Sequence, residues 1–370
     1  MNIVFTGGGT GGHLFPLIAV RREVRRLYPK DDILFHYVGP KDQESFLLLS
    51  QEGFKIHVVA AGKIRRYFSF ANITDVVFFI PLGFLQSFFK LLFIRPKLMF
   101  SKGGTGSLPV TFGAALLGIP VFLHESDVVP GLSNKITSTW AKKIFLSFEK
   151  TEYVNLSKAM VVGNPIRKEL LEGTDQGAKE SLHITFEKPV VLFYGGSQGA
   201  MKINEFVVGI LHDILLRYEV IHVCGKKNYR QVMVESKALI DKNFEKYYHL
   251  YDALNEVQLK HAYKAAGVIV ARAGSASIFE IAALGKPSIL IPLPTAAGDH
   301  QSKNAYEYAK TKAAFIVEES SLTPHFFIGQ IQHSISESNQ MSQAALAFAK
   351  PLAAKAIARE ILEYLTRYKI

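Results

Sequence analysis

Short apolar runs alternate along the chain with glycine-containing turns and with stretches of helical composition. In the first half, the runs with the length of a buried strand lie at residues 3–5, 33–38, 56–60, 97–101, 120–124, 144–147 and 161–162. Helical stretches separate several of these runs, at 13–26, 46–51 and 109–117. This βα alternation predicts a parallel sheet, because the return from one parallel strand to the next is usually made by a helix.

The same pattern begins again near the middle of the chain. A strand-like run at 190–194 leads into a glycine-rich turn at 195–200, much as the run at 3–5 leads into the glycine loop at 6–12. A helix is expected at 204–218, a helix or helix pair broken at Pro351 is expected at 344–368, and 171–188 reads as a polar linker. Further strands are expected at 220–224, 247–251, 268–271 and 287–294. We therefore predict two similar Rossmann-like α/β domains that face a cleft, with a hinge at 163–165: domain 1 at 1–163, domain 2 at 164–350, and a last helix at 351–370 that returns to domain 1.

One stretch, residues 76–93, is unusually apolar. It approaches the length of a membrane span, but on a helix Gly83, Gln86, Ser87 and Lys90 would form a narrow polar stripe. A helix that covers a sheet normally shows a wider polar face. The stretch could therefore be a helix buried on all sides or an apolar patch that lies on a membrane surface, and we prefer the membrane patch. Basic residues flank it and would attract an anionic membrane: Lys63, Arg65, Arg66, Arg95 and Lys97.

Composition narrows the class of protein. A chain of 370 residues suits two domains. Residues 1–150 carry 18 of the 43 basic residues but only 10 of the 32 acidic ones, so the first half is expected to meet an anionic partner. No base-stacking or groove-reading motif accompanies this charge, so nucleic acid is not expected. A single cysteine, Cys224, excludes a disulfide framework and fits a reducing cytoplasm, and we expect a mature N-terminus without a leader.

Polar residues gather where the expected strands 268–271 and 287–294 end. Gly274 and Ser275 open a helix, and free N–H groups at such a start attract phosphate. Glu280 lies three residues after Ser277, so the two could form a capping box, or the carboxylate could accept the hydroxyls of a ribose. The loop at 295–304 adds further hydrogen-bonding side chains. Two consecutive strand ends of this kind predict a ligand crevice.

Two further strand ends in the first half carry candidate chemistry. The glycine loop at 6–12 lacks the spacing of a dinucleotide fingerprint and is followed by His13, which is either a helix-start residue or a base. His124, Glu125, Ser126 and Asp127 follow the run at 120–124, where Ser126 or Asp127 could equally cap a helix.

Eight motifs, in this order and at this spacing, resemble the MurG family of undecaprenyl-diphospho-muramoylpentapeptide β-N-acetylglucosaminyltransferases. They are TGGGTGGH at 6–13, SKGG at 101–104, HES at 124–126, GLSNK at 131–135, VVGNPIR at 161–167, GGSQGA at 195–200, the turn at 274–280 and DHQSKNA at 299–305. The resemblance implies an inverting GT-B glycosyltransferase that needs no metal or cofactor. It implies transfer of N-acetylglucosamine from UDP-N-acetylglucosamine to polyprenyl-linked lipid I, giving lipid II for peptidoglycan. It also implies a peripheral position on the cytoplasmic face of the bacterial inner membrane.

The resemblance assigns roles residue by residue. Positions matching Thr10, Gly11, Gly12, Arg167 and Ser197 line the phosphates of the donor. Positions matching the turn at 275–280 bind the nucleoside end of the donor, and Glu280 is expected to bind the ribose. The position matching Gln301 contacts the donor. The rest of the expected substrate-binding set comes from the same motifs: Asp127, Asn134, Gln198, Ser275, Ala276, Ser277, Ile278, Phe279 and Asn304. Three positions depart from the family pattern: Asp127 replaces an asparagine, Ser126 a glutamine and Thr105 an aromatic residue.

The chemistry requires a base for the acceptor hydroxyl and stabilisation of the departing diphosphate. His13 is the first candidate for the base, with Glu125 and His124 as alternatives. Other functions stay open: transfer to another lipid such as diacylglycerol, a UDP-N-acetylglucosamine 2-epimerase of similar fold, or a membrane-bound UDP-sugar-binding protein without catalysis.

Overall fold

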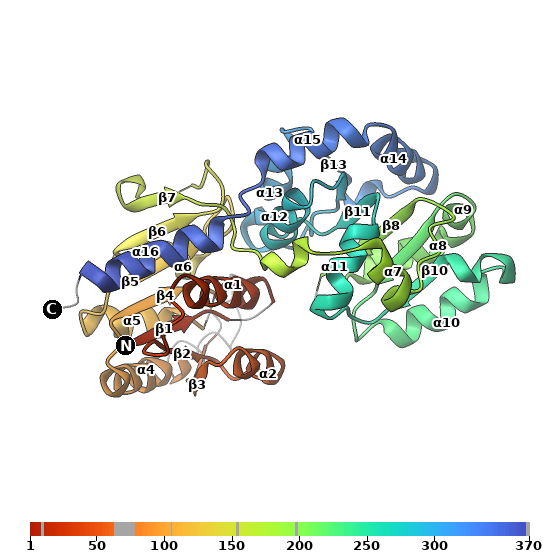
Figure 1. Cartoon of the computed structure of the whole chain (residues 1–370). Helices are drawn as coiled ribbons and strands as arrows, with labels where there is room; N and C mark the ends of the chain where they lie inside the picture. Colours follow the sequence, from red (N-terminus) through yellow and green to blue (C-terminus); the bar gives the residue numbers. More distant parts are fainter. Residues whose placement is uncertain (9–10, 63–77, 105, 153–154, 197–198, 368–370) are drawn as a thin grey trace. The chain divides into compact units, whose positions relative to one another are not determined.

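The chain forms two compact units, each built around a parallel β-sheet (Figure 1). The computed structural model describes residues 1–8, 11–62, 78–104, 106–152, 155–196 and 199–367. Unit 1 comprises Met1–Arg167 together with Pro351–Ile370, and unit 2 comprises Lys168–Lys350. The predicted class, two Rossmann-like parallel-sheet α/β domains, is confirmed. None of the helices in the described ranges is long and apolar enough to cross a membrane.

Unit 1 contains a seven-stranded sheet in the order β3-β2-β1-β4-β5-β6-β7, with every pair parallel. Its strands are β1 (Asn2–Thr6), β2 (Leu34–Gly39), β3 (Lys55–Val58), β4 (Leu98–Ser101), β5 (Val121–Glu125), β6 (Lys143–Leu146) and β7 (Ala159–Val161). The chain builds outward from β1 to β3 and then returns to the other side of β1 at β4. The turns after β1 and β4 therefore flank the topological switch point, where open α/β sheets bind ligands.

Alternating side chains of the unit 1 strands supply two apolar layers. Ile3 and Phe5 face one layer of helices, while Val4 faces the other, as the two-residue period of a strand requires. The unit 1 helices are α1 (Gly11–Leu27), α2 (Gln43–Gln51), α4 (Ile80–Ile94), α5 (Leu108–Leu116), α6 (Leu132–Thr137) and α16 (Ala353–Arg367), with η2 (Leu156–Lys158). The last helix, α16, lies beside α1 (Figure 1) and buries Ile357 and Ile361 in the first layer. The C-terminal segment is thus part of the core of unit 1.

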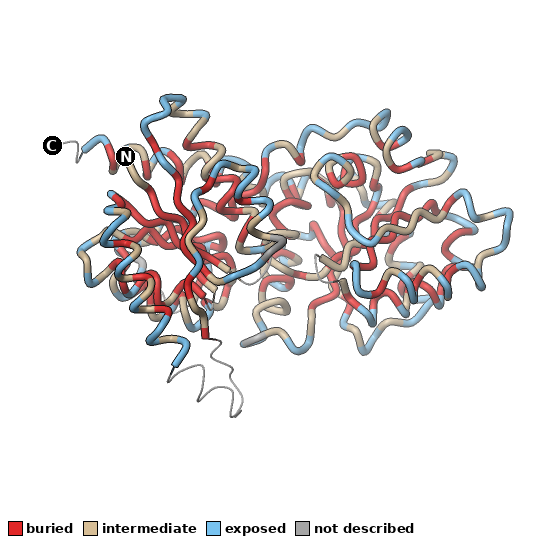
Figure 2. The backbone as a smooth tube through the Cα atoms, turned by 90° about the horizontal axis from the view of Figure 1, so that it is seen from below, coloured by how far each residue is buried: buried red, intermediate tan, exposed pale blue. Residues whose placement is uncertain are grey.

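Unit 2 repeats the design with a six-stranded parallel sheet in the order β10-β9-β8-β11-β12-β13. Its strands are β8 (Val190–Tyr194), β9 (Glu219–Val223), β10 (Tyr248–Tyr251), β11 (Val268–Ala271), β12 (Ser288–Leu290) and β13 (Ala314–Ile316). Its helices are α7 (Asp175–Leu182), α8 (Met201–Gly209), α9 (Leu211–Leu215), α10 (Tyr229–Leu239), α11 (Glu256–Ala265), α12 (Ser275–Ala283), α13 (His300–Ala309), α14 (Pro324–Ser336) and α15 (Ser338–Phe348), with η3 (Lys168–Leu171), η4 (Lys242–Tyr247), η5 (Ala297–Asp299) and η6 (Glu319–Ser321). Here the switch point lies between β8 and β11. The central strands of both sheets are largely buried (Figure 2), whereas the edge strands β3, β7, β10 and β13 are partly exposed.

Several sequence-based expectations are wrong in detail. The segment 171–188 is not an extended linker, because α7 forms there with Thr174 as its N-cap, whose hydroxyl accepts from Gly177 N at 3.0 Å. The single helix expected at 204–218 is divided into α8 and α9. Helices α10, α11 and α14 fall in stretches for which no helix was predicted. The break at Pro351 is confirmed, since α15 ends at Phe348 and α16 begins at Ala353.

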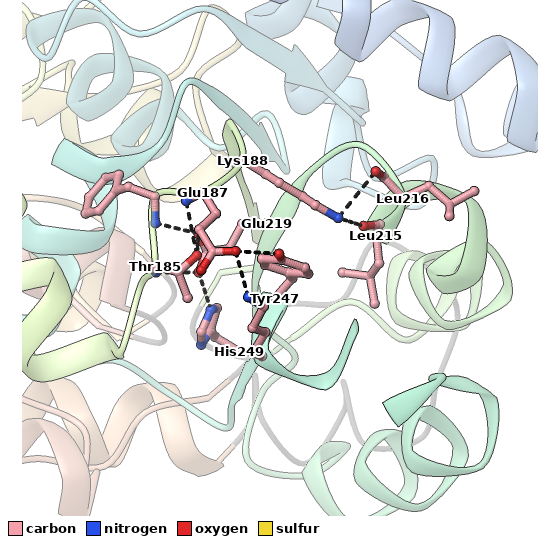
Figure 3. Close-up of polar contacts among 10 residues, drawn as sticks. Thr185, Glu187, Lys188, Leu215, Leu216, Glu219, Tyr247 and His249 are labelled. Atoms are coloured by element: carbon pink, nitrogen blue, oxygen red, sulfur yellow. Dashed lines mark hydrogen bonds and ion pairs between the residues drawn. The ribbon is translucent and has the colours of Figure 1, made fainter. Parts of the chain in front are cut away.

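A buried carboxylate fastens the amino edge of the unit 2 sheet (Figure 3). Glu219, the first residue of β9, accepts hydrogen bonds from Thr185 N at 2.7 Å, Thr185 Oγ1 at 3.0 Å and Phe186 N at 2.9 Å. His249 Nε2 lies 2.7 Å from the same carboxylate. Burial alone would raise the pKa of Glu219, but these partners together lower it. The carboxylate thus joins the segment before β8 to β9 and β10, at the edge opposite the switch-point turns.

Candidate functional site

The carboxyl edge of the unit 2 sheet carries the turns expected to bind a nucleotide. The turn after β8 contains Ser197 and Gln198, which lie outside the described residues. The turn after β11 leads into α12, which begins at Ser275 with Gly274 as its N-cap. Gly274 has no side chain with which to cap the helix, and Ser277 lies inside it, so the capping box considered for Ser277 and Glu280 is absent. The N–H groups at this helix start are thus not satisfied by a capping side chain, and such groups suit an anion.

Glu280 is held by a neighbouring helix. Tyr263, on α11, donates a hydrogen bond from its hydroxyl to Glu280 Oε2 at 2.8 Å. Both residues are buried, and Tyr263 is one of the largest fully buried side chains of the chain. The tyrosine fixes the direction of the carboxylate and was not identified from the sequence, because nothing local links residue 263 to residue 280. The hydrogen bond between Tyr263 and Glu280 forms because α11 packs against β8 and α12 in the folded chain.

The remaining expected donor residues divide between surface and core. Ala276 and Ser277 are half-buried at the start of α12, whereas Ser275, Ile278 and Phe279 are buried. Ile278 and Phe279 point into the core, so a ligand contact at these positions would come from their backbone.

The segment after β12 is tied back to the sheet; the loop expected at 295–304 is wrong in its second half, because α13 begins at His300. Gln301 Oε1 accepts from Leu293 N at 3.0 Å, and Asn304, fully buried, donates to Ala273 O at 3.5 Å. Arg272 donates to the carbonyls of Ile291 and Pro292, both at 3.2 Å, and pairs with Glu319. These contacts join the turns after β11 and β12, so Arg272 is a second organising residue that sequence reasoning missed.

The carboxyl edge of unit 1 brings together the ends of β1, β4 and β5. Helix α1 begins at Gly11, two residues before the place expected from the sequence, and His13 is half-buried in its first turn. Thr10 and Thr105 lie outside the described residues. Gly103, with φ of 81°, leaves room for Asn134: a Cβ at this glycine would lie 1.9 Å from Asn134 Oδ1.

Glu125 is the centre of the unit 1 cluster. Its Oε1 accepts from Asp127 N at 2.9 Å and its Oε2 accepts from Asn134 Nδ2 at 2.8 Å. Burial, and then the charge of Asp127, raise the pKa of Glu125 to about 7, although its hydrogen bonds and Lys102 act in the opposite sense. A carboxyl group with this pKa can exchange a proton near neutral pH, which is the property of a general base or acid.

His124 and Arg167 are more enclosed than the sequence suggested. His124 Nε2 lies 3.0 Å from Gly163 O, so this nitrogen donates to the carbonyl. Burial, and then the charge of Lys102, hold the pKa of His124 well below its usual value. Arg167 is buried and lies over the ring of Phe15, 3.8 Å from its centroid. The structure therefore brings His124, Glu125, Asp127 and Asn134 into one cluster, and places Arg167 against α1.

The two parallel-sheet units have the architecture of the GT-B glycosyltransferase fold. A crystal structure of Acinetobacter baumannii MurG superposes with a TM-score of 0.71 at 23% identity, covering 98% of this chain and 99% of that one. A UDP-GlcNAc 2-epimerase from Neisseria meningitidis superposes with a TM-score of 0.67 at 15% identity, covering 98% and 100%. At these identities the two structures establish the shared fold.

Comparison of the sequence with known proteins identifies the family of the chain. The Glycosyltransferase family 28 N-terminal domain matches residues 3–146, and the Glycosyltransferase family 28 C-terminal domain matches 190–360. A Clostridium tetani protein named UDP-N-acetylglucosamine--N-acetylmuramyl-(pentapeptide) pyrophosphoryl-undecaprenol N-acetylglucosamine transferase is 34% identical over 90% of this chain and 89% of its own length. A protein of the same name from Lachnoclostridium phytofermentans is 35% identical over 90% of each. The chain therefore belongs to glycosyltransferase family 28 and, within it, to the MurG family.

Proposed function

We propose that this enzyme transfers N-acetylglucosamine from UDP-N-acetylglucosamine to the C4 hydroxyl of the muramoyl sugar of lipid I, which yields lipid II. The observation that carries the proposal is the match, along 90% of the chain, to transferases named for this reaction. The location of the expected motifs at the carboxyl edges of both sheets supports it, because open α/β sheets bind their ligands there.

Unit 2 is the proposed donor unit. The uncapped start of α12 offers N–H groups to phosphate, and Glu280, oriented by Tyr263, offers a charged acceptor to the ribose hydroxyls. Gln301 and the turn after β8 complete this side of the donor site. UDP-N-acetylglucosamine is a substrate, and the proposed reaction uses no metal or cofactor. Helix N-termini and Arg167 would stabilise the charge of the departing diphosphate.

Unit 1 is the proposed acceptor unit, and it supplies the base. Glu125 fits this role well, because its pKa of about 7 allows it to take a proton near neutral pH. His13 is the second candidate, because it lies in the first turn of α1 beside the glycine loop. His124 is less suited, since Nε2 is engaged with Gly163 and burial holds the pKa of the ring well below its usual value.

Helix α4 is the proposed membrane contact, and its orientation is the reverse of an ordinary surface helix. Gly83 and Ser87, which belong to the polar stripe, are buried, and Gln86 accepts from Ala60 N at 2.7 Å. The apolar residues face solvent instead: Phe78, Phe79, Leu82, Leu85, Phe89, Leu92 and Phe93. Arg95 and Lys97 flank this face, and residues 63–77, with Lys63, Arg65 and Arg66, lie outside the described part. A peripheral enzyme on an anionic, cytoplasmic membrane surface meets the need of an acceptor anchored by its prenyl chain.

One assay separates the proposal from its rivals. Purified protein is incubated with labelled UDP-N-acetylglucosamine and either lipid I or diacylglycerol in matched micelles, and the products are separated by chromatography. We expect label in a lipid II product, with free UDP released in equal amount. Label in a diacylglycerol product would show that the acceptor is diacylglycerol and not lipid I. Formation of an epimerised UDP-sugar without any lipid would contradict the transferase assignment.

A further inference from the structure

A buried histidine on β9, His222, joins three elements of unit 2 through a chain of hydrogen bonds. His222 Nδ1 lies 2.8 Å from the hydroxyl oxygen of Tyr248, and His222 Nε2 lies 3.0 Å from Asn204 Oδ1. Asn204, on α8, donates from Nδ2 to Cys224 O at 2.9 Å. His222 and Asn204 are each 1% exposed. The chain of bonds therefore runs through the interior of unit 2, from β10 to the carboxyl end of β9.

The direction of each hydrogen bond in this chain is fixed by the Cys224 carbonyl. A carbonyl oxygen can only accept, so the amide nitrogen of Asn204 faces it and Asn204 Oδ1 faces His222. The amide oxygen also only accepts, so His222 carries a hydrogen on Nε2. Burial lowers the pKa of His222 to about 3, so the ring is neutral at physiological pH. Nδ1 of the neutral ring therefore accepts the hydroxyl hydrogen of Tyr248.

The turn after β8 packs against the same carbonyl. Gly199, with φ of 72°, lies so close that an added Cβ would be 2.3 Å from Cys224 O. A second amide, Nδ2 of Asn228, donates to this oxygen at 2.9 Å, so both of its lone pairs are used. Asn204 lies in the first turns of α8, where its backbone N–H donates to Ala200 O at 2.9 Å. The side chain of Asn204 thus fixes the start of α8 to the end of β9, beside Gly199.

The element that this chain of bonds fixes belongs to the proposed donor site. Ala200, the N-cap of α8, has no side chain that could cap the helix, so the N–H groups at its start suit an anion such as a diphosphate. Groups that bind a ligand act well only when they are held within about 0.5 Å of their places. An apolar side chain could fill the space of His222, but only a donor such as Nε2–H holds the Asn204 amide in one of its two orientations.

We propose that His222 is a positioning residue for donor binding: its Nε2–H turns the Asn204 amide toward the Cys224 carbonyl and so fixes the start of α8 for the donor diphosphate. This inference rests on the proposed function, because it requires that the turn after β8 binds UDP-N-acetylglucosamine. His222 contacts no substrate and transfers no proton in this role. Its loss should therefore weaken donor binding and leave the chemical step unchanged.

Two substitutions of His222 separate the roles of its two ring nitrogens. Glutamine places its amide nitrogen near the position of Nε2, whereas the shorter asparagine reaches only the position of Nδ1. We expect His222→Asn to weaken UDP-N-acetylglucosamine binding about five- to tenfold in calorimetry, as loss of one buried hydrogen bond does, with kcat within about twofold. His222→Gln should bind the donor within about twofold of the wild type. Both variants should have a lower melting temperature, because each replaces a packed ring.

His249→Asn is the matched control. His249 lies on β10, opposite Ile221 of β9, and its Nε2 is 2.7 Å from Glu219 at the amino edge of the sheet. Its substitution should lower the melting temperature, because a hydrogen bond to a buried carboxylate is lost, and should leave donor affinity within about twofold. If His249→Asn weakens donor binding as much as His222→Asn does, the cause is a general loosening of unit 2 and the inference is overturned.

Nuclear magnetic resonance of the ring nitrogens tests the geometry in the wild type. We expect a neutral His222 with its hydrogen on Nε2, its signals being those that are lost in His222→Gln. A hydrogen on Nδ1 would overturn the inference, because Nε2 could then not donate to Asn204. Equal donor affinity of His222→Asn and His222→Gln would overturn it as well. A wild type that binds the donor but transfers no sugar to lipid I would refute the proposed reaction, and the calorimetric comparison would still decide the role of His222.

Discussion

Replacement of Phe89 and Phe93 by serine should release the enzyme from membranes without harming its fold. Phe93 is 82% exposed and Phe89 53% exposed, both on the outward face of α4. Phe84 and Phe88 are unsuitable for this test, because they are half-buried and the Phe84 ring lies 5.2 Å from the ring of Phe112 on α5. Substitution of the inner pair would disturb the packing between the two helices.

The size of the effect follows from the exposed area. An aromatic side chain buries about 200 Å², so the two exposed fractions together present about 270 Å². Full transfer of this area into lipid would yield about 7 kcal/mol, and transfer of half of it about 3 kcal/mol. The smaller value corresponds to roughly a hundredfold weaker partitioning onto vesicles. The serine pair leaves the net charge unchanged, so this loss is purely apolar.

Vesicle flotation measures the change directly. Wild-type protein should float with vesicles containing anionic lipid at low salt and less so at high salt, whereas the serine pair should stay in the lower fractions. The paired replacement of Val234 and Leu239 by serine, which are 61% and 54% exposed on α10 of unit 2, is the control and should float as the wild type does. Turnover of a soluble short-chain acceptor should survive in all three proteins. A folded Phe89→Ser, Phe93→Ser protein that still floats would refute the assignment of α4.

Two further predictions concern the carboxylates of unit 2. Glu280→Ala should weaken UDP-N-acetylglucosamine binding by about 1.5–3 kcal/mol in calorimetry, since a charged acceptor of hydrogen bonds from the ribose hydroxyls is lost. Tyr263→Phe removes only the hydroxyl that orients Glu280, so it should weaken binding by less. If Glu280→Ala binds the donor as tightly as the wild type, Glu280 is only a structural partner of Tyr263. Glu219→Gln should destabilise the protein by about 3 kcal/mol in urea unfolding at pH 7, because a buried charged partner is lost. The folded-state pKa of Glu219 is lowered, so its contribution is present above its usual pKa and is lost as the pH falls through the folded-state value. The difference between wild type and Glu219→Gln should therefore shrink on acidification, and a difference independent of pH would contradict this account.

The sequence was sufficient to locate most of the strands and the turns that carry the site, although β13 was not predicted. Each glycine-rich or polar turn follows an apolar run, so the position of His13, His124 or Ser275 at a carboxyl strand end could be predicted from local pattern. The linker at 171–188 was misjudged because its helix, α7, depends on tertiary burial of Ala178 and Leu182 beneath α11. Only a packed structure supplies that partner.

Long-range partners are the part that local patterns could not reveal. The polar stripe of α4 was visible in the sequence, but the pattern did not predict that this stripe would face inward, against Ala60 and α5. Tyr263 and Arg272 form hydrogen bonds with residues 17 to 20 positions away. Such pairs are set by strand order, which a single sequence specifies only through the whole fold.

Two of the buried glutamates, Glu219 and Glu125, show how one residue type serves opposite ends of similar sheets. Glu219 lies at an amino edge and accepts four hydrogen bonds, which stabilise its charge and lower its pKa despite burial. Glu125 lies at a carboxyl edge, accepts two hydrogen bonds and faces Asp127, so burial prevails and its pKa rises. A carboxylate that is fully satisfied holds a fold together and has little tendency to take a proton. One that is buried with fewer hydrogen bonds beside a like charge is ready to exchange a proton near neutral pH.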